Sequence, residues 1–268
     1  MSEDLPLGKQ VETPRRYWPE ILAAIPRAKG REAQALTDIP FQGWDRWIAW
    51  EFAWHGETSG RQVGILDILV PSSSVAIFES KSLKLYLNSF FYRRFDDQEK
   101  MLAELSDRLQ TVCETALHLR YRELSEICGD LNVAMPQGSC IDDLSAIAEG
   151  ASLQVESRAT GQRNLYWSHL FRSLCPVTGQ PDWATIMVEA QGVALDKEGL
   201  LGYLLGFADH EGFHESCVEQ IFMDIWRECE PEELAITARF TRRGGIDINP
   251  FRTSSEQLIE RNLRQLRQ

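Results

Sequence analysis

Two segments of this chain share one spacing of apolar residues, and this internal repeat constrains the fold more than any other feature. The segment SLKLYLNSF at residues 82–90 aligns with GLLGYLLGF at residues 199–207. A strand-like apolar run lies before each segment, and a helical run and a further strand-like run follow it. This strand, strand, helix, helix, strand plan occurs twice and predicts an α+β protein with two related halves.

The pattern extends well beyond the two matching segments. Strand-like runs precede them at residues 63–79 and 184–189, and further strand-like runs close the halves at residues 117–121 and 236–240. Apolar residues at helical spacing predict one long helix in each half. They are Leu102, Leu105, Leu109 and Val112 in the first half and Val218, Ile221, Phe222, Ile225, Trp226 and Cys229 in the second.

We therefore expect two domains, at residues 1–130 and 131–268. Residues 122–163 have a mixed composition and are interpreted as the connector, and residues 255–268 are predicted to form a polar C-terminal helix. The alternative explanation of the repeat is that two unrelated amphipathic helices happen to share a spacing of apolar residues.

The composition limits the classes of partner. A net charge of -12 argues against nonspecific binding to nucleic acid. The first residues lack the pattern of a signal peptide, and no apolar run reaches membrane-spanning length, so we expect no membrane association. The six cysteines form no CxxC pair, which is typical of reduced thiols and predicts a cytoplasmic protein.

The segment CPVTGQPDW, at residues 175–183, is the first candidate for chemistry. Pro176, Gly179 and Pro181 interrupt regular structure, so we expect Cys175 to lie on a rigid loop close to Asp182. A cysteine on such a loop beside a carboxylic acid is typical of a nucleophile. The alternative is a cysteine with no chemical role.

A second candidate is HESC at residues 214–217, which we expect to begin a helix. A carboxylate accepts two parallel N–H bonds from a guanine-like edge, so His214 and Glu215 together could bind a heterocycle. Glu215 also suits the first turn of a helix for purely electrostatic reasons. A zinc site built from Cys175, His210, His214 and Cys217 is a weaker alternative, because no HExxH or CxxC motif accompanies it.

Two further segments suit an anionic ligand. Lys81, in ESKS at residues 79–82, falls in the first turn of a predicted helix, where a cation is unfavourable unless an anion is bound. Ser80 could simply cap that helix. Arg242 and Arg243 stand beside a Gly-Gly turn and suit a phosphate, although a solvated strand end is the simpler explanation. The sequence contains neither a dinucleotide-binding GxGxxG motif after a strand nor a P-loop.

Taken together, these motifs resemble the NADPH-dependent 7-cyano-7-deazaguanine reductases, the nitrile reductases of queuosine biosynthesis, in their long two-domain form. The likeness covers nearly the whole chain. Its motifs are LPLGK at residues 5–9, IPR at 25–27, WDRWIAWEFAW at 44–54, ESKSLKLYLNSF at 79–90, CIDD at 140–143, CPVTGQPDW at 175–183, FHESCVEQIF at 213–222 and TRRGGIDINP at 241–250.

The resemblance implies tandem tunnelling-fold (T-fold) domains, in which helices back antiparallel sheets. It implies Cys175 as the nucleophile and Asp182 as the proton donor. The substrate contacts that it implies are Phe78, Glu79, Ser80, His214 and Glu215. The NADPH contacts that it implies are Ser80, Lys81, Arg243 and Gly244, with no metal. The expected partners are a small 7-deazaguanine substrate and a second copy of the chain in a homodimer.

The expected chemistry is addition of the Cys175 thiolate to the nitrile, which gives a thioimide, followed by two hydride transfers to the primary amine. Oxidation could join Cys175 and Cys217 in a protective disulfide. Three alternatives stay open: a zinc-dependent cyclohydrolase of the GTP cyclohydrolase kind with the same fold, a cysteine hydrolase or acyltransferase that uses Cys175 and His214, and a purine-binding module without activity.

Overall fold

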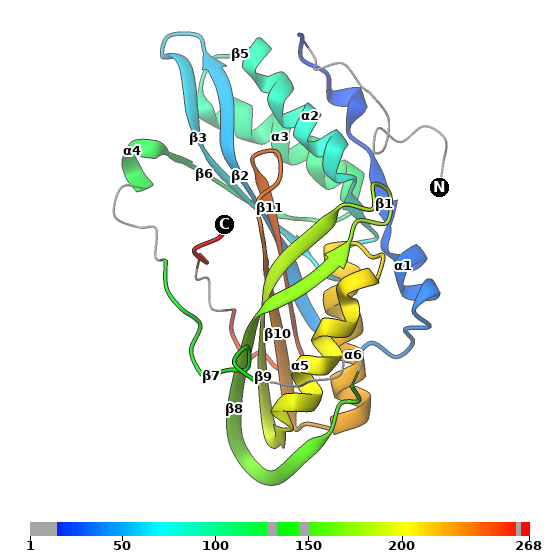
Figure 1. The fold of residues 1–268 in the computed structure, drawn as a ribbon. Coiled ribbons are helices and arrows are strands. Elements are labelled where there is room, and N and C mark those ends of the chain that lie inside the picture. The colour runs from blue at the N-terminus through cyan, green and yellow to red at the C-terminus, as the bar shows by residue number, and fades with distance from the viewer. Residues whose placement is uncertain (1–14, 128–132, 145–150, 261–263) are drawn as a thin grey trace. The chain divides into compact units, whose positions relative to one another are not determined.

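The computed structural model describes residues 15–127, 133–144, 151–260 and 264–268 of the chain (Figure 1). The motif LPLGK and Cys128 lie outside these ranges. Internal contacts divide the chain into two compact units, described separately below. Unit 1 comprises Met1–Lys29, Arg46–Leu131 and Arg242–Asp247, and unit 2 comprises Gly30–Asp45, Asn132–Thr241 and Ile248–Gln268.

The sheet of unit 1 is built on a long hairpin. Strand β2 (Gln42–Gly56), which begins in unit 2, lies beside β3 (Gly60–Pro71), and β3 pairs antiparallel with β6 (His118–Glu123). The short β5 (Arg94–Phe95) pairs in parallel with the end of β2. A separate two-stranded sheet joins β1 (Ala24–Pro26) to β4 (Ala76–Phe78). Strand β4 ends directly before the helix that carries the ESKS motif, and its pairing with β1 holds the start of that helix beside residues 24–26.

The helical elements of this part of the chain are η1 (Pro19–Ile21), α1 (Arg27–Ala33), which continues into unit 2, α2 (Ser80–Ser89), η2 (Phe90–Tyr92), α3 (Gln98–Cys113) and α4 (Leu124–Ile127). The ring of Phe52 on β2 lies 5.3 Å from that of Phe90. Helix α3 buries Met101, Leu105, Leu109 and Cys113, spaced at about one turn of helix. The predicted first-half helix is therefore confirmed, with a buried face slightly rotated from the expected one.

Unit 2 holds one sheet in the order β11, β10, β9, β8, β7. Its strands are β7 (Ser139–Cys140), β8 (Val155–Leu174), β9 (Pro181–Leu195), β10 (Glu233–Phe240) and β11 (Ile246–Thr253), whose first two residues belong to unit 1. The pairs from β8 to β11 are antiparallel, and β7 pairs in parallel with β8. Alternate residues of β9, such as Ile186 and Val188, enter the core, as the period of a strand requires.

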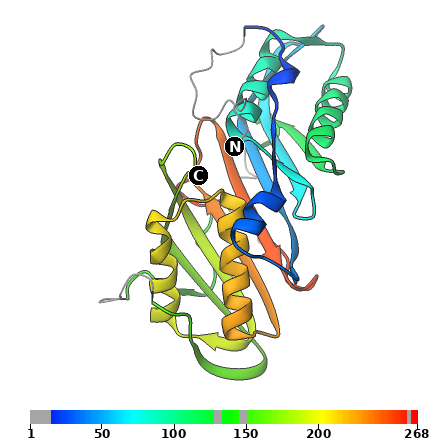
Figure 2. The same cartoon turned by 90° about the vertical axis from the view of Figure 1, so that its right-hand side faces the viewer.

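Helices α5 (Lys197–Leu205) and α6 (His214–Cys229) lie side by side on one face of this sheet, joined by η3 (Gly206–Asp209) (Figure 2). Their apolar residues, including Leu200, Leu204, Ile221 and Phe222, form one buried cluster with β9 and β10. Burial of a large aliphatic or aromatic side chain is worth roughly 1.5–3 kcal/mol, so this cluster sets the position of α6 on the sheet. That position matters because α6 begins with the HESC motif.

The structure confirms the α+β plan and the repeat. The two matching segments form α2 with η2 and α5 with η3, and each is followed by a long helix and a strand. Antiparallel sheets backed by helices, which the T-fold implies, are present in both units. In the described ranges, no helix is long and apolar enough to cross a membrane. The division into domains 1–130 and 131–268 stays a prediction.

Three local expectations were wrong. Strand β8 starts at Val155, inside the supposed connector at residues 122–163. Pro181, which was expected to interrupt regular structure, instead begins β9, and the adjacent Asp182 pairs with Ser173 across the hairpin. The described residues from 255 to the C-terminus contain no helix. Leu258 packs instead against Ala235 and Phe251, so this segment contributes apolar contacts that a search for helical periodicity does not reveal.

Gly43 generates a stability prediction within unit 2. Its backbone φ is +140°, and a Cβ atom there would overlap the carbonyl oxygen of Phe251. Gly161 has a φ of +72° with open space around its Cα. We expect Gly43→Ala to lower the free energy of unfolding by about 2 kcal/mol more than Gly161→Ala, because both carry backbone strain but only the first adds a clash. Urea unfolding of both variants measures this, and equal losses would contradict it.

Candidate active site

Cys175 lies on a tight turn that its own backbone closes. The turn follows β8, and the Cys175 N–H donates to the carbonyl of Gln180 at 2.9 Å. The Gly179 N–H donates back to the carbonyl of Cys175 at 2.9 Å, with Gly179 at a φ of +62°. The rigid loop predicted from the sequence is therefore present. The thiol is free and the residue is half-buried, so the sulfur combines a fixed position with partial access.

A short backbone pairing joins this loop to the segment that leads into α6. The Leu174 N–H donates to the His210 carbonyl at 2.8 Å, and the Gly212 N–H donates to the Leu174 carbonyl at 3.0 Å. These bonds form a parallel bridge between Leu174 and Glu211. Cys175 follows one side of the bridge directly, and His214 follows the other within two residues. The bridge thus brings two motifs that are distant in the sequence into one site.

Asp182 and His214 face each other across this site. The Asp182 side chain is 5% exposed, and its Oδ1 lies 3.9 Å from His214 Nε2. That separation allows an attraction when the imidazole is protonated but is too long for a hydrogen bond. The His214 ring packs edge-on against Phe240, with 4.0 Å between ring centroids. Phe240 thereby restricts the orientation of the imidazole.

Glu215 and Cys217 are buried in the first turn of α6. Burial raises the pKa of Cys217 to about 12, and the nearby carboxylates of Glu215 and Asp182 act in the same direction. A hydrogen bond with Ser173 opposes this rise only in part. Cys217 is consequently a neutral, inaccessible thiol near pH 7, and Cys175 is the more accessible thiol of the pair. Both thiols are free.

The zinc alternative finds no support in the described part of the chain. There, no group of three His, Cys, Asp or Glu side chains is arranged so that it could hold a metal ion. His210 instead packs edge-on against Phe207 at 5.1 Å between ring centroids. Burial lowers the pKa of His210, so its imidazole is neutral near pH 7.

In unit 1, Glu79 is the N-cap of α2, which corrects the expectation that Ser80 could hold this position. Its carboxylate accepts from the backbone N–H groups of Lys81 at 2.6 Å and Ser82 at 2.8 Å. Glu79 is fully buried, and Phe78 before it packs edge-on against Trp47. Each carboxylate oxygen has a second lone pair, so a substrate contact is compatible with capping.

The glycine turn of the TRRGG motif lies close to helix α2 within unit 1. Gly244 has a φ of +59°, and a Cβ atom there would lie 3.2 Å from the side chain of Lys84. Lys84 stands on α2 three residues after Lys81, on the same side of the helix. The Arg243 N–H donates to the Ile246 carbonyl at 2.9 Å and closes the turn. Lys84 is not among the site residues predicted from the sequence, although its spacing from Lys81 is a usable signal.

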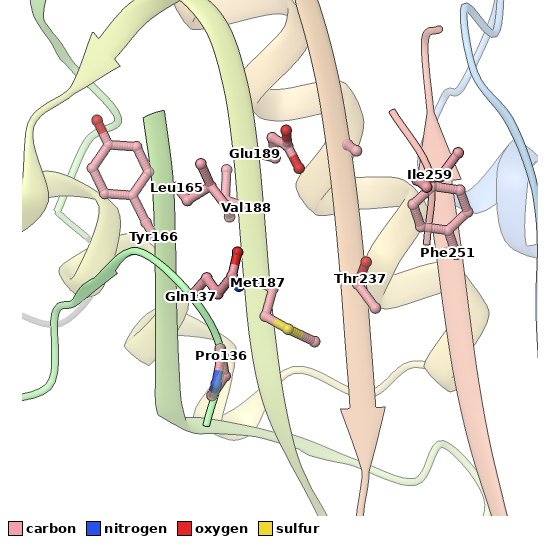
Figure 3. A pocket seen from close by; sticks show the side chains of 11 residues that line it. Pro136, Gln137, Leu165, Tyr166, Met187, Val188, Glu189, Thr237, Phe251 and Ile259 are labelled. Atoms are coloured by element: carbon pink, nitrogen blue, oxygen red, sulfur yellow. The ribbon is translucent and has the colours of Figure 1, made fainter. Parts of the chain in front are cut away.

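The predicted site residues thus fall into two groups. Cys175, Asp182, His214 and Glu215 belong to unit 2. Phe78, Glu79, Ser80, Lys81, Arg243 and Gly244 belong to unit 1. A pocket of unit 2 lined by Gln137, Met187, Thr237 and other residues includes no member of either group (Figure 3).

Comparison with known proteins decides the family. A family model described as the N-terminal part of nitrile reductase, 7-cyano-7-deazaguanine-reductase, matches residues 13–121, and one described as QueF-like protein matches residues 181–258. A relative from Desulfotalea psychrophila, named NADPH-dependent 7-cyano-7-deazaguanine reductase, is 42% identical over 100% of this chain and 99% of its own. The chain belongs to this reductase family.

Other reductases of the family match over similar lengths. The protein from Dechloromonas aromatica is 40% identical over 100% of this chain and 96% of its own, and that from Acinetobacter baumannii is 38% identical over 98% and 97%. The solved apo structure of the archaeosine synthase QueF-Like covers 36% of this chain and 95% of its own at 16% identity. Its TM-score of 0.32 is too low to support an argument about fold or function.

The contrast between the two thiols of this reductase can be tested by alkylation. In the native protein near pH 8, we expect iodoacetamide to modify Cys175 at least about 100-fold faster than Cys217, because Cys217 is buried and its pKa is high. Peptide mass spectrometry over time measures both rates. In guanidinium chloride the two rates should converge. Equal rates in the native protein would contradict the assigned burial.

Proposed function

We propose that this chain reduces the nitrile of 7-cyano-7-deazaguanine to the primary amine, giving 7-aminomethyl-7-deazaguanine for queuosine biosynthesis, a tRNA modification, with NADPH as the reductant. The full-length match to reductases of this name carries the proposal. The separate features of the two units agree with it, since unit 2 offers a nucleophile beside an acid and unit 1 offers basic groups for phosphate.

In the proposed mechanism, Cys175 attacks the nitrile carbon, and Asp182 gives a proton to the nitrile nitrogen. This step forms a C–S bond and leaves a neutral thioimide. NADPH, when bound, supplies one hydride to each of two successive reductions. After the first hydride transfer the C–S bond breaks, the thiolate of Cys175 leaves and an imine remains. The second hydride and further protons complete the amine.

The other residues of the site hold the substrate. His214 is restrained by Phe240 and would orient the ring. To relay a proton with Asp182, it would need the 3.9 Å between Nε2 and Oδ1 to shorten when the substrate binds. In unit 2, Glu215 would accept N–H bonds from the deazaguanine edge, as carboxylates do in bidentate recognition. In unit 1, Glu79 and the backbone at Phe78 and Ser80 are proposed as substrate contacts of the same kind. Correct placement of the nitrile against the sulfur accounts for much of the rate in such a scheme.

The basic group of unit 1 fits the phosphates of NADPH. Ser80 and Lys81 lie at the N-terminal end of α2, and Gly244 presents exposed backbone beside Lys84. Ammonium and guanidinium groups next to a glycine turn supply charge and N–H donors to a phosphate. Arg243, next to Gly244, would supply the guanidinium. These groups would bind and orient the cofactor and take no part in proton transfer.

The proposal extends to the setting of the enzyme. We place it in the cytoplasm as a homodimer whose partners are small molecules, without nucleic acid or membrane. In the described part of the chain, β6 pairs with β3 alone, and an edge strand of this kind favours association with another chain. Sedimentation equilibrium of the purified protein tests the dimer, and a monomer at all concentrations would contradict it.

The covalent step is tested by intact mass of protein mixed with 7-cyano-7-deazaguanine before NADPH is added. The wild type should gain the mass of the nitrile, and Cys175→Ala should gain none. Asp182→Asn should slow adduct formation by about 10²–10⁴-fold, because the nitrogen loses its proton donor. Cys140→Ala, which removes an exposed thiol of β7, should react as the wild type does. An adduct on Cys175→Ala would exclude the proposed nucleophile.

The cofactor contacts are tested by kinetics. We expect Lys81→Ala and Arg243→Ala to raise the KM for NADPH by about 10–100-fold, since each removes a charge-assisted hydrogen bond worth roughly 1.5–3 kcal/mol. Formation of the adduct without NADPH should keep its normal rate. Lys100→Ala, which removes an exposed cation paired with Asp96, is the control and should change neither value. An unchanged KM in both test variants would remove these residues from the cofactor site.

A further inference from the structure

A buried carboxylate stands one turn after Glu215 on helix α6. Glu219 accepts from Arg31 through both oxygens, with Nε to Oε2 at 2.8 Å and Nη2 to Oε1 at 2.9 Å. It also accepts from Arg252, with Nη2 to Oε1 at 2.8 Å and Nε to Oε1 at 3.1 Å. Two guanidinium groups therefore hold one carboxylate from two directions. The reductase chemistry described above does not use this residue.

Arg252 is itself anchored on the sheet side. Its side chain is fully buried, and its Nη1 lies 2.8 Å from Asp45 Oδ1. The same nitrogen donates to the carbonyls of Trp44 at 3.1 Å and Phe251 at 2.9 Å. Two carboxylates and two guanidinium groups balance in charge, so the network can be buried without net charge. It ties α6 to the ends of β2 and β11 that belong to unit 2.

Contacts from α1 and from the residues that follow it hold the adjoining part of α6. A Cβ atom at Gly30 would lie 2.7 Å from Ser216 Oγ, so α1 approaches α6 closely at this point. The Gln34 side chain donates to the Ser216 carbonyl at 3.2 Å. The ring of Phe41 lies 5.2 Å from that of Phe222 and faces the guanidinium of Arg252 at 5.6 Å. The beginning of α6 is thus held on several sides.

Stability alone is a poor reason for such a network. Burying two ion pairs costs about as much in lost hydration as the attraction returns, and apolar replacements are often as stable. What a buried network does supply is a single geometry, because each group accepts few alternative partners. Here the network defines the position of the first turn of α6, that is, its rotation about the helix axis and its distance from the sheet. This turn carries His214 and Glu215.

We infer that Glu219 is a positioning residue for the reductase: clamped between Arg31 and Arg252, it holds the first turn of α6 so that His214 and Glu215 keep a fixed relation to Asp182. This inference rests on the proposed function. Glu219 touches neither substrate nor cofactor in this scheme, and it acts through the helix.

The test is Glu219→Gln, which keeps the shape of the side chain and removes its charge. We expect the KM for 7-cyano-7-deazaguanine to rise about 10-fold or more and adduct formation to slow by a similar factor. The KM for NADPH should stay within about twofold of the wild type. Glu219→Asp keeps the charge and should recover part of the loss, which a purely steric effect would not allow.

The matched control is Glu260→Gln. Glu260 is 2% exposed and pairs with Arg239 at 2.6 Å, so it is an equally buried acid of the same unit. It lies on the C-terminal segment and accepts from Trp44 Nε1 at 2.6 Å. This variant should lose thermal stability without a change in either KM. The positioning role is wrong if both variants lower Tm equally and Glu219→Gln keeps the wild-type KM for 7-cyano-7-deazaguanine and the wild-type rate of adduct formation.

A readout without substrate separates this inference from the proposed function. Cys217 N–H donates to the Phe213 carbonyl at 3.0 Å, so the amides from Cys217 to Glu219 report on the first turn. Their hydrogen exchange should accelerate about 10-fold in Glu219→Gln and remain normal in Glu260→Gln. If Glu219→Gln does not fold, Arg31→Gln removes the more exposed arm of the clamp and should shift the exchange and the KM in the same direction. If the folded variants keep the wild-type hydrogen exchange at these amides, the inference is wrong. If the wild-type protein forms no adduct with 7-cyano-7-deazaguanine, the proposed function alone is wrong.

Discussion

The candidate site of unit 2 depends on a short backbone pairing between Leu174 and residues 210–212. Two hydrogen bonds at this bridge, each worth about 1 kcal/mol net, are too weak to create the arrangement by themselves. The apolar cluster of α5, α6 and the sheet supplies the driving force, and the bridge selects one register within it. From that register follow the nearness of Cys175 to the start of α6 and the meeting of Asp182 with His214.

Buried acids shape the electrostatics of the same region. Asp182 lies on β9, and Glu215 and Glu219 lie one turn apart on α6. The charged groups that face these three acids differ. Glu219 is neutralised by Arg31 and Arg252, whereas Asp182 faces an imidazole that is charged only when protonated. Burial raises the pKa of the Cys217 thiol and keeps it protonated, and the carboxylates of Glu215 and Asp182 act in the same direction. One helix therefore carries a structural ion pair and residues suited to proton chemistry, separated by a single turn.

Unit 1 shows how a sequence signal can have two physical explanations at once. The ESKS motif attracted attention because a lysine in the first turn of a helix is unfavourable without an anion. Glu79 partly answers that objection within the chain, since its carboxylate caps the helix beside Lys81. The approach of Gly244 to Lys84 sets the glycine turn of the TRRGG motif against the same helix, and this is where we propose that the NADPH phosphates bind.

The sequence by itself determined the order of the elements, the internal repeat and the family, because strand and helix periods and rare residue combinations are local properties. It placed Cys175 on a braced turn and His214 at a helix start for the same reason. Tertiary structure decided that Asp182 is a strand residue, that Glu79 caps its own helix, that Lys84 meets Gly244 and that Glu219 is clamped by two arginines. Those facts depend on the pairing of segments far apart in the chain, and neither hydrophobic period nor local motif specifies which distant side chain completes a contact.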